Sequence, residues 1–242
     1  MYTLPVIGIA LAACLATFIG GSIALKLKNK IHLVLGFSAG AVVAVALFDL
    51  LPEAIELGEG FFSTTTLLLW AAIGFFAYLV LDRTIIMHTH HDDGHDHEKR
   101  GKLGAGTLSL HSFIDGLAIG VAFQASVPVG LVVAAAVLTH DFSDGINTVN
   151  LILKNGGTRK EAMRWLILDS LAPVLGVLST LFFTLPQEWL ALVLATFAGF
   201  FLYIGASDLI PESHHAHPKF LTTIMTLLGA AVLYVVVRIA GV

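Results

Sequence analysis

Apolar residues follow one another along this chain in long runs, without the alternation of a half-buried strand or the single apolar stripe of a surface helix. Charged residues, glycine and proline divide these runs into eight segments, each close to the roughly 20 residues that a helix needs to cross a bilayer. We therefore predict eight membrane-spanning helices, at residues 4–25, 32–54, 64–86, 104–125, 128–152, 162–184, 188–212 and 219–240. Pro173 predicts a kink in the sixth.

Composition supports an all-α integral membrane protein. Hydrophobic residues make up 57% of the 242 residues and charged residues only 12%, whereas soluble domains carry about 25% charged residues. We expect one transmembrane domain over residues 1–242, with a histidine-rich cytoplasmic loop at 87–103 between the third and fourth helices.

Lysine and arginine gather in the connections that follow the odd-numbered spans. The positive-inside rule then places these connections in the cytoplasm. We expect both termini on the extracytoplasmic side of the cytoplasmic (plasma or inner) membrane. Glu53, Glu56, Glu59 and Glu188 stand on that side without basic neighbours, and an acidic rim of this kind raises the local concentration of cations.

A pattern His-x-Phe-x-Asp-Gly occurs twice, from His111 to Gly116 and from His140 to Gly145. In a helix, residues four apart lie on the same face, so each histidine can reach toward a common point with its aspartate. Such a pair could merely link two helices by hydrogen bonds. Four ionisable groups at membrane depth more often bind or move a charged species, and imidazole with carboxylate is a ligand set for Zn²⁺, Fe²⁺, Mn²⁺, Co²⁺ or Cd²⁺. We predict a metal site formed by His111, Asp115, His140 and Asp144.

A second repeat relates the second span to the seventh. Gly40 precedes Asp49, Pro52 and Glu53 by the same spacings that separate Gly199 from Asp208, Pro211 and Glu212. These two spans run in opposite directions, which predicts an inverted repeat of the kind found in secondary transporters. We expect a 3+2+3 arrangement in which helices 1–3 correspond to helices 6–8 and helices 4 and 5 are central. Asp49 and Glu53 would then lie at an entrance and Asp208 and Glu212 at an exit, although helix capping could also explain these acids.

Two histidine-rich segments lie on the expected cytoplasmic side. They contain His88, His90, His91, His95 and His97 in the first and His214, His215 and His217 in the second. Histidine-rich tracts bind metals, so we expect a regulatory or buffering role, against the alternative of a solvated spacer.

The motifs resemble those of the ZIP (Zrt- and Irt-like) family of divalent-metal transporters, in its bacterial or archaeal form, over essentially the whole chain. His111, Ser112, Asp115 and Gly116 match the fourth-helix motif of that family, and His140, Asp141, Asp144 and Gly145 match the fifth. The resemblance implies eight helices with extracytoplasmic termini, a metal path between helices two, four, five and seven, a binuclear site and a homodimer.

The chain departs from the family pattern in three ways. Ser143 stands where many relatives have proline, and Ala172 stands before Pro173 where relatives with a second metal often have glutamate. Asp169, one turn earlier, could take the place of that glutamate. Ser112, Asp141 and Asp169 are therefore candidates either for a second metal or for hydrogen bonds to the metal-ligating residues. Both central acids are aspartate where many relatives have glutamate.

The expected function is transport of a divalent transition metal into the cytoplasm, with Zn²⁺ as the leading substrate and no catalytic cofactor or nucleic-acid partner. An intramembrane zinc metalloenzyme is an alternative, although the sequence lacks the His-Glu-x-x-His motif of many zinc hydrolases. A sensor that binds metal without transporting it is another. We expect a transporter rather than an enzyme.

Overall fold

Helices make up nearly all of the computed structural model, which describes residues 3–23, 31–90, 97–215 and 220–240. Within these described ranges, eight helical stretches are long and apolar enough to cross a membrane, at 4–22, 32–57, 64–83, 101–125, 127–153, 159–180, 187–214 and 220–239. Each boundary lies within four residues of the predicted one. The prediction of an all-α membrane protein with eight spans is confirmed.

Two of the eight spans are each composed of three consecutive helical segments. The elements are α1 (Thr3–Ile23), α2 (Ile31–Val45), η1 (Ala46–Leu50), α3 (Leu51–Leu57), α4 (Thr64–His90), α5 (His97–Ala125), α6 (Val127–Lys154), α7 (Arg159–Thr180), α8 (Gln187–Tyr203), η2 (Ile204–Leu209), α9 (Ile210–His215) and α10 (Phe220–Ala240).

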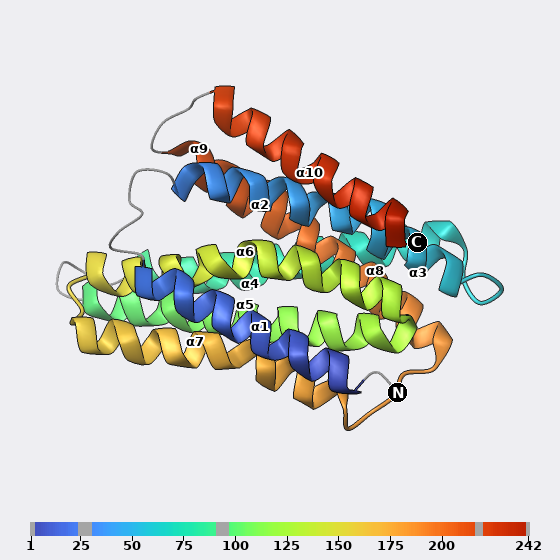
Figure 1. The fold of residues 1–242 in the computed structure, drawn as a ribbon, viewed down its shortest axis with the longest axis horizontal. Helices are drawn as coiled ribbons and strands as arrows, with labels where there is room; N and C mark the ends of the chain where they lie inside the picture. Colours follow the sequence, from blue (N-terminus) through green and yellow to red (C-terminus); the bar gives the residue numbers. More distant parts are fainter. Residues whose placement is uncertain (1–2, 24–30, 91–96, 216–219, 241–242) are drawn as a thin grey trace.

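The long helices lie side by side along the long axis of the molecule (Figure 1). The beginning of α1 and the end of α10 lie at the same end of the bundle as α3, whereas α9 lies at the opposite end (Figure 1). An even number of spans gives this placement, because each span reverses the direction of the chain.

The main helix pairs come in matching sets. Helix α1 packs against α6 as α7 packs against α5, and α2 packs against α10 as α8 packs against α4. Helices α5 and α6 also pack against each other. Suppose that each of the first three spans is exchanged with its counterpart among the last three, and α5 with α6. The α1–α6 pair then becomes the α7–α5 pair, and the α2–α10 pair becomes the α8–α4 pair.

Glycines allow the backbones of these paired helices to approach closely. A Cβ atom at Gly145 would overlap the carbonyl oxygen of Thr17 on α1, and one at Gly116 would overlap that of Pro173 on α7. Small residues allow such close packing between membrane helices. Because these glycines directly follow Asp144 and Asp115, two close helix contacts lie next to the candidate ligands.

Two π-helical segments, η1 and η2, occupy matching positions in the repeat, immediately before Leu51-Pro52 and Ile210-Pro211. Within these turns the amide of Leu51 donates to the carbonyl of Ala46, and that of Ile210 donates to the carbonyl of Gly205, five residues back in each case. The following proline has no N–H to continue the ordinary α-helical pattern. A run of apolar residues does not distinguish π-helical from α-helical turns, so these segments are not predicted from the hydrophobic pattern.

The sixth span ends earlier than predicted, at Thr180 rather than at 184. The side chain of Gln124 donates to the carbonyls of Thr180 and Phe183 and accepts from the amide of Leu185. These bonds hold the apolar residues after Thr180 in a non-helical connection, which an apolar run alone does not predict.

Helices also extend into the connection predicted at 87–103. Helix α4 continues to His90 and α5 begins at His97. Lysine, arginine and glutamate between 98 and 102 are good helix formers, and they can extend a helix beyond the bilayer.

Candidate metal centre

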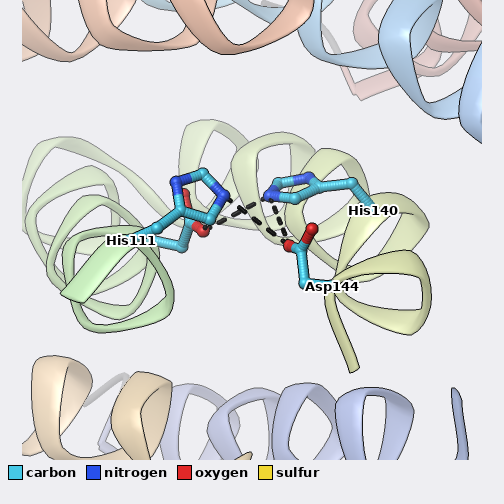
Figure 2. Close-up of side chains that lie close together, drawn as sticks. His111, His140 and Asp144 are labelled. Atoms are coloured by element: carbon cyan, nitrogen blue, oxygen red, sulfur yellow. Dashed lines mark hydrogen bonds and ion pairs between the residues drawn. The ribbon is translucent and has the colours of Figure 1, made fainter. Parts of the chain in front are cut away.

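Helices α5 and α6 bring together the four residues predicted to bind metal, which we call the central cluster: His111, Asp115, His140 and Asp144 (Figure 2). Each helix contributes one histidine and the aspartate one turn further along. The Nε2 atom of His111 lies 3.2 Å from Oδ2 of Asp115 and 3.6 Å from Oδ2 of Asp144. The Nε2 atom of His140 lies 3.3 Å and 3.8 Å from the same two oxygens.

These separations suit a tetrahedral metal ion. Metal–ligand distances of about 2.0–2.2 Å place the ligand atoms of a tetrahedral zinc site roughly 3.3–3.6 Å from one another. The four nitrogen–oxygen separations of the central cluster lie near this range, and all four ligand atoms lie within 4.8 Å of one another. Small movements of the side chains would therefore bring all four onto one ion.

The backbone of α6 determines how His140 faces the cluster. The Nδ1 atom of His140 lies 3.0 Å from the carbonyl oxygen of Ala136, one turn earlier in the helix. A carbonyl can only accept, so the proton of a neutral His140 lies on Nδ1 and the lone pair of Nε2 points toward the two aspartates. A lone pair facing carboxylate oxygens requires a cation between them, which is either a second proton on the ring or a metal ion.

The His111 ring contacts a residue outside the sequence motifs, Tyr78. The hydroxyl of Tyr78 on α4 lies 2.6 Å from Nδ1 of His111, in a buried contact. The two histidine rings are tilted by 50° with their centroids 5.5 Å apart. Tyr78 lies one turn before Asp82, so the two residues form a polar face on the otherwise apolar third span. This polar face is the sequence signal that could have identified Tyr78.

Burial makes the charge of the central cluster costly without a cation. His140 and Asp115 are fully buried, and His111 and Asp144 are at most 6% exposed. Oδ1 of Asp115 and Oδ2 of Asp144 have no hydrogen-bond partner among the described residues. Buried charges are stable when they are paired or when they coordinate a metal, so this arrangement fits a divalent cation.

Ser112 and Asp169, two of the candidates for a second metal, are joined directly to each other. Oδ1 of Asp169 accepts a hydrogen bond of 2.9 Å from Ser112, and its Oδ2 accepts one of 2.7 Å from Thr148. Asp169 on α7 thus links α5 and α6 at a fully buried position. Its bonds to two hydroxyls favour a structural role beside the central cluster over direct ligation of a second ion.

Asp141, the third of these candidates, follows His140 on α6. Its side chain is fully buried, and neither of its oxygens has a hydrogen-bond partner in the part of the chain that the structure describes. Asp141 is outside the four-residue group whose ligand atoms converge.

The acids predicted at the two ends of the path differ in their surroundings. Asp49 lies in η1, is fully buried, and has no hydrogen-bond partner for either oxygen among the described residues. Glu53 on α3 is partly exposed and Glu212 on α9 is exposed. The backbone of Asp208 lies in η2, but its side chain is outside the described set.

For most of the predicted regulatory histidines, the structure describes either no atoms or the backbone alone. His91, His95 and His217 are not described, and His88, His90, His97 and His215 are described for the backbone only. His214 is the one whose side chain is described. Its Nε2 atom lies 3.3 Å from the hydroxyl oxygen of Thr223 on α10, and its Nδ1 atom lies 3.0 Å from the carbonyl oxygen of Ile210.

The fold and the central cluster together define a membrane protein of eight spans with a buried histidine and aspartate group that fits a metal ion. A family model described as "ZIP Zinc transporter" matches residues 3–107 and 104–237. The chain belongs to this family, as its motifs indicated.

Individual relatives match parts of the chain. Zinc transporter ZIP6 of Homo sapiens is 31% identical over 134 residues, which cover 52% of this chain and 18% of that protein. Zinc transporter foi of Drosophila melanogaster is 30% identical over 123 residues, which cover 50% and 17%. Zinc transporter ZIP10 of Danio rerio is 33% identical over 107 residues, which cover 44% and 13%. The matched regions thus span less than a fifth of the length of these relatives.

Proposed function

We propose that this protein carries divalent transition-metal ions across a membrane, with Zn²⁺ as its principal substrate. The central cluster carries the proposal, because four ligand atoms converge within 4.8 Å on two packed helices in the interior of the bundle. Membership of the zinc transporter family and the names of the relatives support zinc. Fe²⁺, Mn²⁺, Co²⁺ and Cd²⁺ suit the same ligands, because no thiolate or fixed geometry excludes them.

The proposed route passes from Asp49 and Glu53 to the central cluster and leaves by Asp208 and Glu212. Asp49 lies in η1 directly before α3 and Asp208 lies in η2 directly before α9, and α3 and α9 lie at opposite ends of the bundle (Figure 1). A surface pocket of about 580 Å³ lies beside Pro52 at the α3 end and includes Glu56 and Glu59. Acids around such a pocket attract arriving cations.

We propose import toward the cytoplasm, with both termini on the extracytoplasmic side of the cytoplasmic membrane. The concentration of lysine and arginine after the odd-numbered spans supports this orientation. The matching helix pairs support the 3+2+3 inverted repeat, in which one group of helices would tilt against the other to alternate access. The histidine-rich segments would then receive ions on the cytoplasmic side.

The homodimer that the family resemblance implies is also part of the proposal. Among the eight spans, the stretches 64–83 on α4 and 220–239 on α10 have the smallest share buried within one chain, 22% each. Their apolar surfaces are available to lipid or to a second copy. The molecular mass of the protein in detergent would distinguish a dimer from a monomer.

A transporter fits this site better than a metalloenzyme does. Catalytic zinc sites keep three protein ligands and an open position for water or substrate, whereas the central cluster presents four converging ligand atoms. A sensor remains a functional alternative that only a flux measurement separates from a transporter.

Reconstitution into liposomes that contain a zinc-sensitive dye tests the proposal. We expect zinc influx for the wild type and a loss of influx for His140→Ala and Asp144→Ala. His32→Ala serves as the matched control, because His32 lies at the beginning of the second span, away from the central cluster. Absence of influx in the wild type would refute transport, and full influx in both cluster variants would refute the site.

A further inference from the structure

The two histidines of the central cluster are held in different ways, although their helices are related by the repeat. Nδ1 of His140 faces the carbonyl oxygen of Ala136 on its own helix, whereas Nδ1 of His111 faces the hydroxyl of Tyr78 on a different helix. A carbonyl oxygen only accepts a hydrogen bond, but a phenol hydroxyl either donates or accepts. Nδ1 of His140 must therefore carry a proton, whereas Nδ1 of His111 can either carry a proton or accept one from Tyr78.

Tyr78 has no polar counterpart in the other half of the repeat. Gly199 packs against the carbonyl of Ala71 on α4, and its counterpart Gly40 packs against the carbonyl of Thr226 on α10. Ala71 on α4 therefore corresponds to Thr226 on α10, which aligns the two helices residue by residue. The residue that corresponds to Tyr78 in this register is Leu233, an apolar residue that is 2% exposed. The hydroxyl beside His111 is therefore an addition to one half of the molecule and not a consequence of the repeat.

Neighbouring aromatic residues fix the position of the Tyr78 ring. It lies 5.6 Å from the ring of Phe200 and 5.4 Å from that of Tyr203, centroid to centroid, both on α8. The hydroxyl of Tyr203 donates to Asp82 at 2.8 Å. Tyr78 is 8% exposed, so its hydroxyl is held against His111 by packing from α8.

We propose that Tyr78 is a positioning residue of the metal site, whose hydroxyl orients His111 and supports that ring both with and without a bound metal. When Nε2 of a neutral His111 ligates metal, Nδ1 carries the proton and donates to the Tyr78 oxygen. When Nε2 instead donates its own proton to Asp115, the Tyr78 hydroxyl turns and donates to Nδ1. Nδ1 of His140 faces a carbonyl and keeps its proton in both states, so only His111 can move its proton between the two ring nitrogens.

Cobalt provides the probe, because bound Co²⁺ absorbs visible light in a way that depends on its ligands. The proposal rests on the proposed metal site, and His140→Ala defines which part of the absorption comes from that site. Partners that orient metal-ligating histidines typically contribute a factor of 10–100 in affinity. We expect Tyr78→Phe to weaken Co²⁺ binding at the site by about 10–100-fold.

Tyr203→Phe is the matched control, since it removes a hydroxyl from a neighbouring buried tyrosine that donates to Asp82. We expect this control to bind Co²⁺ within a few-fold of the wild type. We also expect Tyr78→Phe to have no further effect on Co²⁺ binding when His111 is already alanine, because the two residues would act as a unit.

Equal Co²⁺ affinity of Tyr78→Phe and the wild type would overturn the proposal. So would an equal loss in the His111→Ala background, because that would indicate packing and not a hydrogen bond to His111. If His140→Ala bound Co²⁺ as the wild type does, the proposed site itself would fail, which is a separate result.

A measurement on the unmodified chain avoids any folding defect of the variant. In the zinc-loaded protein labelled with ¹⁵N-histidine, we expect the His111 ring, assigned by its absence in His111→Ala, to carry its proton on Nδ1 in a hydrogen bond. A His111 ring without a proton on Nδ1 would contradict the proposal.

Discussion

Gly145→Ala tests whether the close contact between α1 and α6 sets the position of the central cluster. A Cβ atom at this position would overlap the carbonyl oxygen of Thr17 and press on the amide of Gly21, both backbone atoms of α1. No side-chain rotation relieves such an overlap, so α1 and α6 must move apart. Overpacking of an interior typically costs about 1–3 kcal/mol, and we expect a loss of this size in the free energy of unfolding.

Gly8→Ala on α1 is the matched control, because a Cβ atom there meets no atom of the described residues within 4 Å. Alanine favours a helix over glycine by at most about 1 kcal/mol, so this variant should be as stable as the wild type or slightly more stable. Unfolding in detergent by increasing concentrations of SDS, followed by circular dichroism, gives the comparison. If both variants matched the wild type within about 0.5 kcal/mol, as surface substitutions do, the close-contact argument would be wrong.

Three further outcomes are expected. Asp169→Ala should lower the free energy of unfolding by about 1–3 kcal/mol, because it leaves two buried hydroxyls without their acceptor; an unchanged stability in the SDS titration would contradict the linking role of this residue. Thr158→Ala should cost about 0.5–2 kcal/mol of stability, since it removes the capping box at the start of α7, and should leave zinc influx intact; a loss of influx would show that this helix end takes part in transport. Asp49→Asn should raise the external zinc concentration needed for half-maximal influx into liposomes; an unchanged value would remove Asp49 from the route.

The spans and the central cluster could be predicted from sequence because both depend on local rules. Apolar length sets the eight spans, and a spacing of four residues on a helix sets the face shared by His111 and Asp115. The second copy of the His-x-Phe-x-Asp-Gly motif then places His140 and Asp144 on the next helix along the chain. None of these steps requires knowledge of how side chains pack.

The remaining features depend on contacts between distant parts of the chain. The Tyr78 ring packs against α8 while its hydroxyl contacts His111 on α5. Gln124 bonds residues about sixty positions away, where the sixth span ends. The link from Asp169 to Ser112 and Thr148 joins three helices. Periodicity along one segment carries no information about such partners.

The central cluster has an electrical consequence for any movement across the membrane. With His111 neutral and His140 holding the second proton that takes the place of the metal, Asp115 and Asp144 leave the empty cluster with one net negative charge, and a divalent ion that displaces this proton cancels it. The loaded cluster is then neutral and its position is insensitive to voltage, whereas moving the empty cluster through a full 100 mV would cost or yield about 2.3 kcal/mol for each charge. The membrane potential would therefore act on the return of the empty transporter and not on the step that carries the metal.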